Sequence, residues 1–271
     1  MRRRWKIALA GAVTVVAVSV LTAALRGTRA PPTVAPAAAT PAAATPAELP
    51  APVPPAFTVP TPRPLRGGST AIEWAPVERP IAARTKPSRR AAVIARIGRS
   101  TPERTANILL VLARAHDESG GVWVKVRLPV LPNGTTGWVP RGALGGYVEV
   151  RTHLVVDLRR LTVTLLRDGR PVFSAPIGVG TPSSPTPRGE FYVRNRLTDY
   201  RSPFYGPIAF GTSARSPTLT DWPAGGFVGI HGTNRPELIP GRISHGCIRL
   251  RNRDIVRLDK LMPVGTPLTI R

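Results

Sequence analysis

The sequence predicts a mainly β protein, in which two β domains follow a hydrophobic N-terminal segment and an extended linker. Short apolar runs, several with two-residue alternation, recur between Gly, Pro and Asn turns from residue 67 onward, and this spacing is typical of strands. One stretch near the C-terminus has helical spacing instead. The composition also changes along the chain, which divides it into residues 1–29, 30–66, 67–146 and 147–271.

The chain is strongly basic, with 38 Lys and Arg against 15 Asp and Glu and a formal net charge of +23. Such a charge favours anionic partners. The basic residues are scattered, and the strands do not interleave cations with aromatic side chains. A solvated arginine-rich surface is therefore favoured over a specific nucleic-acid site. A single cysteine excludes an intrachain disulfide.

Residues 1–29 predict a membrane anchor. Arg2, Arg3 and Arg4 precede an uncharged stretch over 7–25, which at about 1.5 Å per residue nearly spans a hydrocarbon core of about 30 Å. Positive charge before this stretch predicts that the N-terminus lies on the inner side of the membrane and the chain after Leu25 on the outer side. A cleaved signal peptide is the alternative, and it would make the protein secreted.

Residues 30–66 are dominated by Ala, Pro, Thr and Val. Such a segment has too few large apolar side chains to form a core. At about 3.1 Å per residue it could hold the remainder roughly 100 Å from the membrane. We expect a disordered stalk.

The segment 67–146 predicts a small β domain. Its apolar runs lie at 92–97, 108–112 and 122–128, and the turn at 132–134 leads into a further strand at 136–139. Trp123-Val124-Lys125-Val126 followed by Gly137-Trp138-Val139 resembles bacterial SH3-like domains of cell-wall proteins. The resemblance implies a small barrel that binds wall peptide or positions the neighbouring domain. Trp123 and Trp138 are expected in its core rather than in a ligand site.

The segment 147–271 predicts a second β domain with one short helix. Asn252 is a plausible helix cap, and Ile255, Leu258, Leu261 and Met262 fall on one helical face before Pro263. The run 194–222 predicts either a lid over a site or the packing of the domain edge. The expected strands are 153–158, 161–166, 171–177, 190–193, 227–231 and 268–270.

The only cysteine, Cys247, follows His231 and His245 at short spacing. A free thiol has a pKa near 8.5 and is mostly protonated at neutral pH, so a nucleophilic cysteine needs a nearby imidazole to take its proton. Either histidine could do so. The amides of Gly246 and Cys247 are natural donors to an oxyanion. A zinc site on the two histidines and the thiol has acceptable ligands but no evident fourth one, so we expect neither a metal nor a cofactor.

The stretches around these residues carry a resemblance. His231-Gly232, the long loop that follows and Ser244-His245-Gly246-Cys247-Ile248-Arg249-Leu250 resemble the signature of the L,D-transpeptidase catalytic domain. Thr186-Pro187-Arg188-Gly189-Glu190-Phe191 is similar to a stretch common upstream in that family. The resemblance covers residues 147–271 and implies a β-sandwich.

The resemblance also implies roles for the site residues. Cys247 would be the nucleophile and His231 the general base, with its imidazole oriented by the carbonyl of Gly232. The remaining site residues would line the oxyanion site or shape the pocket: Ser244, His245, Gly246 and Arg249.

The implied activity is the cross-linking of peptidoglycan. Cys247 would attack the bond between residue three and D-Ala four of a tetrapeptide stem, and an amine of a neighbouring stem would resolve the thioester as a 3→3 cross-link. The alternatives are an L,D-carboxypeptidase that uses water, and a non-catalytic cell-wall-binding protein. The expected partners are stem peptides, anionic wall polymers and the membrane.

Overall fold

The computed structural model describes residues 71–198, 202–218 and 226–271, all of which belong to one compact unit. The predicted anchor over 1–29 and stalk over 30–66 lie outside these residues. Within the described part of the chain, no helix is both long enough and apolar enough to cross a membrane. The secondary structure is mainly β with one short α-helix, as the sequence predicts.

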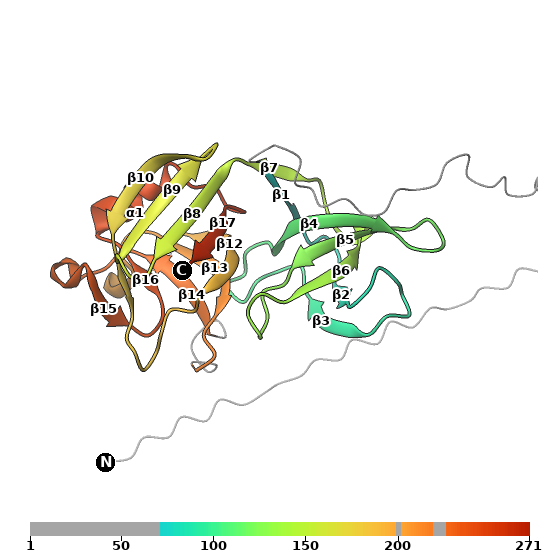
Figure 1. Cartoon of the computed structure of the whole chain (residues 1–271), viewed down its shortest axis with the longest axis horizontal. Helices are drawn as coiled ribbons and strands as arrows, with labels where there is room; N and C mark the ends of the chain where they lie inside the picture. The colour runs from blue at the N-terminus through green and yellow to red at the C-terminus, as the bar shows by residue number, and fades with distance from the viewer. Residues whose placement is uncertain (1–70, 199–201, 219–225) are drawn as a thin grey trace, which may run out of the picture. The chain divides into compact units, whose positions relative to one another are not determined.

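The N-terminal part of the described chain forms an antiparallel sheet with the strand order β3-β2-β6-β5-β4-β1-β7. Figure 1 shows β4, β5 and β6 side by side within it. A 3-10 turn, η1 (Arg141–Ala143), follows β6. The strands are β1 (Ile72–Pro76), β2 (Ile81–Arg84), β3 (Val93–Ile97), β4 (Ile108–His116), β5 (Val122–Arg127), β6 (Thr136–Pro140) and β7 (Val148–Val150).

Alternation of apolar and polar residues builds the core of this first sheet. In β5, Val124 and Val126 are fully buried while Lys125 between them is half-buried, because successive side chains of a strand point to opposite faces. Trp123 is 2 % exposed, and its indole N–H donates to Asp117 Oδ2 at 2.8 Å. Its burial agrees with the expected place in the core, whereas Trp138, also expected there, is only half-buried in β6. The SH3-like assignment stays a prediction.

The second sheet has the order β10-β9-β8-β17-β12-β13-β14-β16-β11-β15. Most neighbours are antiparallel, whereas β8 with β17, β14 with β16 and β11 with β15 are parallel. The first sheet takes in β7 through Val150, beyond the expected division at 146/147. The strands are β8 (Thr152–Asp157), β9 (Thr162–Arg167), β10 (Arg170–Pro176), β11 (Gly178–Gly180), β12 (Gly189–Leu197), β13 (Ala209–Arg215), β14 (Phe227–His231), β15 (Gly241–Ser244), β16 (Ile248–Arg249) and β17 (Pro267–Ile270).

The three consecutive strands β8, β9 and β10 show how the local sequence determines strand pairing in this sheet. Asp168 and Gly169 connect β9 to β10 with φ of 49° and 77°, the left-handed conformations that suit a tight two-residue turn. Val163 and Phe173 from this hairpin share one buried cluster with Ile230 and Ile248 from the far end of the strand order. The sheet therefore curves around its own core.

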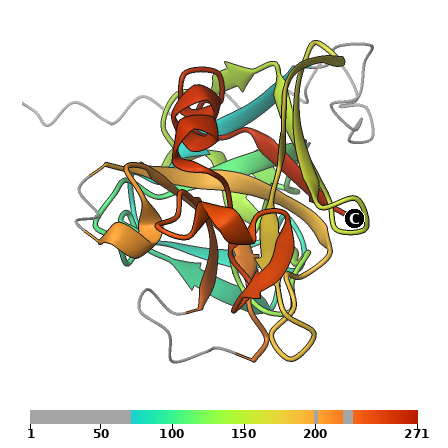
Figure 2. The same ribbon diagram turned by 90° about the vertical axis from the view of Figure 1, so that its left-hand side faces the viewer.

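One helix, α1 (Asn252–Asp259), covers part of that core. Ile255 and Leu258 are fully buried, as predicted, whereas Leu261 and Met262 of the predicted helical face lie beyond the end of the helix, with Met262 2 % exposed. The helix lies behind β9 and β10 in Figure 1 and is the red coil at the top of Figure 2. Two 3-10 turns precede it in the chain, η2 (Pro203–Tyr205) and η3 (Pro236–Leu238).

Candidate active site

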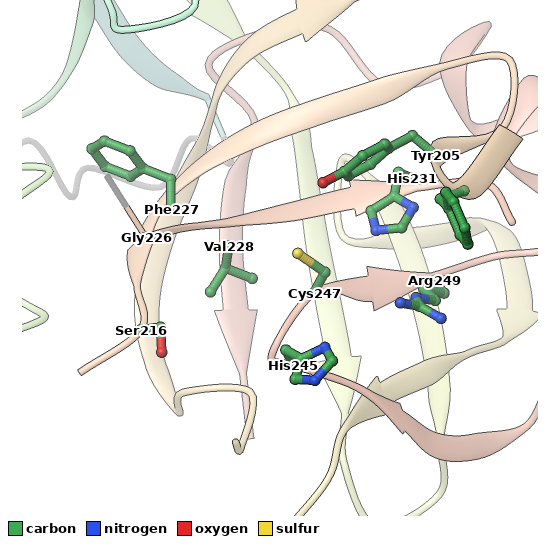
Figure 3. A pocket seen from close by; sticks show the side chains of 10 residues that line it. Tyr205, Ser216, Gly226, Phe227, Val228, His231, His245, Cys247 and Arg249 are labelled. Atoms are coloured by element: carbon green, nitrogen blue, oxygen red, sulfur yellow. The ribbon is translucent and has the colours of Figure 1, made fainter. Parts of the chain in front are cut away.

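Cys247 lies in the turn between β15 and β16. Strand β16 pairs in parallel with β14, with Ile248 opposite Ile230, so Cys247 lies beside the middle of β14. There the backbone N–H of Gly229 donates to the Cys247 sulfur at 3.4 Å. His231 ends β14, and both side chains line the same pocket (Figure 3). The structure thus brings together the thiol and the histidine sixteen residues before it.

His231 is held in one orientation by its own backbone. Its imidazole is 3 % exposed, and Nδ1 lies 2.6 Å from the carbonyl oxygen of Gly232. A carbonyl oxygen only accepts hydrogen bonds, so Nδ1 carries the proton and Nε2 is left as a proton acceptor. Burial lowers the pKa of His231 to about 4, although the Gly232 bond opposes the shift. The imidazole is therefore neutral at physiological pH.

The electrostatics of Cys247 favour the protonated thiol. Burial raises the pKa of Cys247, against the opposing effects of the Gly229 N–H and the positive charge of Arg249. Arg249 lines the pocket, and its Nε is buried without a hydrogen-bond partner among the described residues. A neutral thiol and a neutral imidazole in one pocket can transfer a proton when the sulfur attacks.

The turn before Cys247 is fixed by Ser244. Its hydroxyl donates to the Cys247 carbonyl oxygen at 2.6 Å and accepts from the Gly246 N–H at 3.1 Å. The Gly246 amide, which the sequence predicts as an oxyanion donor, is thus bonded to Ser244 in this structure. Gly246 has a φ of +116°, which only glycine adopts readily, and this explains its place in the turn.

Thr186 holds the same turn from the other side. Its hydroxyl donates to the Gly246 carbonyl oxygen at 2.8 Å and accepts from the Gly180 N–H at 2.9 Å. The side chain is 4 % exposed. Thr186 begins the stretch 186–191 that resembles the family upstream of the cysteine motif. Nothing in that stretch indicates a contact with Gly246, which lies sixty residues later in the chain.

Asn252 does not cap α1 through its side chain. The residue before the helix is Arg251, which makes no side-chain cap. The Asn252 Oδ1 instead accepts from the Thr233 N–H at 2.9 Å, and a Cβ on Gly232 would come within 2.3 Å of that oxygen. Asn252 thus packs on the loop that carries the carbonyl bonded to His231.

Aromatic side chains form the other side of the pocket. The Tyr205 ring lies 4.7 Å from the His231 ring between centroids, tilted by 58°, and Phe204 beside it is 62 % exposed. Within the run 194–222, η2 lines the pocket, while Ala209–Arg215 form a strand of the sheet; the choice between a lid and edge packing stays a prediction. The lining residues that the sequence did not indicate are Phe204, Tyr205, Ser216, Gly226, Phe227 and Val228.

The pocket has a volume of about 350 Å³ and is mostly apolar, and its titratable lining residues besides Tyr205 are His231, His245, Cys247 and Arg249. It is large enough for part of a peptide, since ligand pockets begin near 300 Å³. Among the described residues, no group of three or more His, Cys, Asp or Glu side chains is placed to hold a metal ion.

Comparison with known proteins agrees with the motif. The family model of the L,D-transpeptidase catalytic domain (YkuD) matches residues 151–270. The Bacillus subtilis protein named L,D-transpeptidase YqjB is 30 % identical over 126 residues, which are 44 % of this chain and 70 % of that protein. The chain belongs to the L,D-transpeptidase (YkuD) family. The predicted resemblance of the catalytic domain is thereby confirmed.

Other relatives cover the same domain. The Bacillus subtilis protein named L,D-transpeptidase YkuD is 36 % identical over 118 residues, 44 % of this chain, and the match spans 65 % of that relative's length. A crystal structure of an Enterococcus faecium L,D-transpeptidase mutant is 26 % identical, covers 45 % of this chain and 50 % of that one, and superposes with a TM-score of 0.36.

Proposed function

We propose that the protein is a peptidoglycan L,D-transpeptidase that forms 3→3 cross-links through a thioester on Cys247. Membership of the family supports the reaction class. The observation that carries the assignment to residues is the joint placement of Cys247 and a neutral, backbone-oriented His231 in one apolar pocket. This pair supplies a nucleophile and an acceptor for its proton.

In the first half-reaction the thiol proton passes to His231 Nε2 while the sulfur attacks the carbonyl between residue three and D-Ala four of the stem. The C–N bond breaks, D-alanine leaves with the proton from His231, and a thioester remains on Cys247. With the Gly246 amide bonded to Ser244, the Cys247 N–H is the donor that we assign to the developing oxyanion.

In the second half-reaction a side-chain amine of a neighbouring stem attacks the thioester. His231 takes the amine proton, the C–S bond breaks and the thiol is regenerated. Water in place of the amine gives the L,D-carboxypeptidase reaction. Arg249, with its charge in the pocket and its unpaired Nε, offers a site for a carboxylate of the stem.

The substrate implies action on the wall side of the membrane. We propose that residues 1–29 anchor the chain and that 30–66 carry the described domains toward the wall. The net charge of +23 adds attraction to anionic wall polymers. Neither a metal nor a cofactor is needed for the proposed steps.

The test is mass spectrometry of the full chain incubated with disaccharide-tetrapeptide, beside Cys247→Ala. A dimer lighter than two substrates by one alanine, absent with Cys247→Ala, supports the proposal. A tripeptide product alone replaces transpeptidation with the carboxypeptidase reaction. No turnover and no acyl adduct from a protein folded by circular dichroism overturns both, and leaves a wall-binding role.

A further inference from the structure

A buried ion pair joins the first sheet to the second. Glu103 lies in the loop between β3 and β4, and its carboxylate accepts from Arg194 of β12 at 2.7 Å. The Arg194 side chain is 1 % exposed and that of Glu103 is 10 % exposed. A charge so buried is costly unless it is paired, so Arg194 depends on a loop ninety residues earlier in the chain.

The loop that carries Glu103 is itself rigid. The Thr101 N–H donates to the Thr105 carbonyl at 2.9 Å, and the two threonine hydroxyls lie 2.8 Å apart. The Asn195 amide nitrogen donates to Glu103 Oε2 at 3.2 Å and to Thr105 Oγ1 at 2.9 Å. Both carboxylate oxygens of Glu103 are thus used.

Arg194 and Asn195 reach the same loop because β12 is irregular there. The pairing of β12 with β13 shifts register between Val193 and Asn195, and such bulges re-aim side chains that would otherwise alternate. Asn195 Oδ1 also accepts from the Gly211 N–H of β13 at 3.0 Å. The bulge thus ties the loop of the first sheet to two strands of the second.

The other end of this connection is a wall of the active-site pocket. The Arg194 guanidinium carbon lies 3.7 Å from the centre of the Phe227 ring, and that of Arg215 lies 4.9 Å from it. Phe227 lines the pocket with Cys247 and His231 (Figure 3). A guanidinium over an aromatic face stabilises the ring's position through a cation–π contact.

A second loop of the first sheet holds the same region. The Asn133 amide donates to the Arg215 carbonyl at 2.7 Å and accepts from the Arg215 N–H at 3.0 Å. Arg215 is the register partner of Phe227. The loop at 101–105 therefore reaches Phe227 through Arg194, and the loop around Asn133 holds Arg215, the strand partner of Phe227.

We propose that Arg194 is a positioning residue, held by Glu103, which fixes Phe227 as a wall of the pocket and so lets the N-terminal β domain set the affinity for the stem peptide. The proposal rests on the proposed function for its substrate. It assigns the N-terminal domain a part in substrate selection that requires no wall-binding surface of its own.

The test compares the full chain with Glu103→Gln, Phe227→Leu and the double variant. Glu103→Gln removes the charge and replaces one acceptor oxygen by a donor that faces the Asn195 amide. Loss of the cation–π contact predicts that KM for the tetrapeptide donor rises about threefold to tenfold, which corresponds to about 0.7–1.4 kcal/mol. We expect kcat to change less than about twofold. A contact that binds the ground state and the transition state equally well affects KM and leaves kcat unchanged. Phe227→Leu keeps the Glu103–Arg194 ion pair and removes the aromatic ring. It therefore tests the contact between Arg194 and Phe227 without leaving a buried charge unpaired.

Because Glu103 acts through Phe227, the two effects are not additive. Adding Glu103→Gln to Phe227→Leu should change KM by less than about twofold, the sign of coupled residues in a double-mutant cycle. The matched control is Glu73→Gln, which breaks the Glu73–Arg114 ion pair inside the first sheet and should leave KM unchanged.

A second measurement does not depend on turnover. Cys247 is the only cysteine, so modification reports on the pocket alone. Glu103→Gln should change the ratio of Cys247 reaction rates with N-phenylmaleimide and iodoacetamide by about threefold, because only the aromatic reagent is large enough to meet Phe227. If the wild-type chain does not react with the stem peptide, the proposed function fails. The ratio of modification rates then still tests whether Glu103 positions Phe227 through Arg194. An unchanged ratio in a folded Glu103→Gln protein, or fully additive KM effects, overturns the proposal.

Discussion

The imidazole Nδ1 of His231 lies 2.6 Å from the carbonyl oxygen of Gly232, the next residue in the chain. The bond places the proton on Nδ1 and leaves Nε2 to accept one, without an acidic side chain as the third member. Burial keeps the ring neutral, with a pKa of about 4. A neutral His231 fits the proposed proton transfer from Cys247 better than a preformed thiolate–imidazolium pair.

His231 and His245 both line the pocket, and exchange of each for Gln separates their roles. We expect His231→Gln to lower the acylation rate by about 10²–10⁴-fold, the usual contribution of a general base. His245→Gln should cost about tenfold or less, since the role proposed for His245 is to shape the pocket. The measurement is single-turnover formation of the Cys247 acyl adduct by mass spectrometry. A greater loss with His245→Gln would exchange the two assignments.

The low pKa of His231 also predicts a pH dependence of stability. The folded-state value of about 4 lies below the ordinary 6.5, so between these pH values the unfolded chain binds a proton that the folded chain does not. The stabilising contribution of the neutral ring is complete above pH 6.5 and is lost as the pH falls toward 4, by about 3 kcal/mol in all. Urea unfolding at pH 7 and pH 4.5 measures this loss.

Two variants isolate the contribution of His231 to this pH dependence of stability. His231→Gln should lose less stability between these pH values than the wild type, by about 2–3 kcal/mol. His116→Gln, at an exposed position of the first sheet, should behave as the wild type. Equal pH dependence in the wild type and His231→Gln would show that the ring does not carry the linkage.

The sequence predicted the parts of the fold that depend on local pattern. Strand β9 alternates in burial along Thr162–Arg167, and Asp168-Gly169 forms the expected turn. The placement of Cys247 near His231 was also predictable, because the glycines and the spacing of the motif restrict how its loop can fold. These features depend on neighbours in the chain.

The sequence could not predict contacts made by distant loops. Arg194 begins the run 194–222, which the sequence assigned to a lid or to the domain edge, yet its side chain is buried against Glu103 from the loop between β3 and β4. The Gly246 amide reads as a free donor, yet Ser244 occupies it. Tyr205 lies in a run rich in Arg, Pro and Gly that gives no sign of its contact with His231. Each depends on a tertiary approach that propensity and periodicity do not encode.

Thr186→Val tests the support of the turn before Cys247. The variant keeps the shape of the side chain but leaves the Gly246 carbonyl and the Gly180 N–H without their buried partner. We expect a loss of about 1–3 kcal/mol in the free energy of unfolding. Displacement of the turn should lower kcat by about tenfold, since small misplacements of reacting groups are costly. Thermal unfolding and turnover of the tetrapeptide measure the two effects.

The control for Thr186 is Thr164→Val on β9, where the hydroxyl lies 3.5 Å from Ser174 at the surface. It should change stability by less than about 0.5 kcal/mol. If Thr186→Val lowers stability but leaves kcat unchanged, the hydroxyl supports the fold without positioning Cys247.

Asn252 offers the sharpest separation of a structural role from a positioning one. Its Oδ1 accepts from the Thr233 N–H, beside the carbonyl that orients His231. Serine is as good a helix cap as asparagine, but its shorter side chain does not reach Thr233. Asn252→Ser should therefore leave the buried Thr233 N–H without its acceptor, lower the free energy of unfolding by about 1–3 kcal/mol, and lower kcat by about tenfold through the displaced loop. Asn252→Asp keeps an oxygen at the same reach and should retain most of kcat. Equal kcat for Asn252→Ser and Asn252→Asp would show that the bond to Thr233 does not position the Gly232 carbonyl.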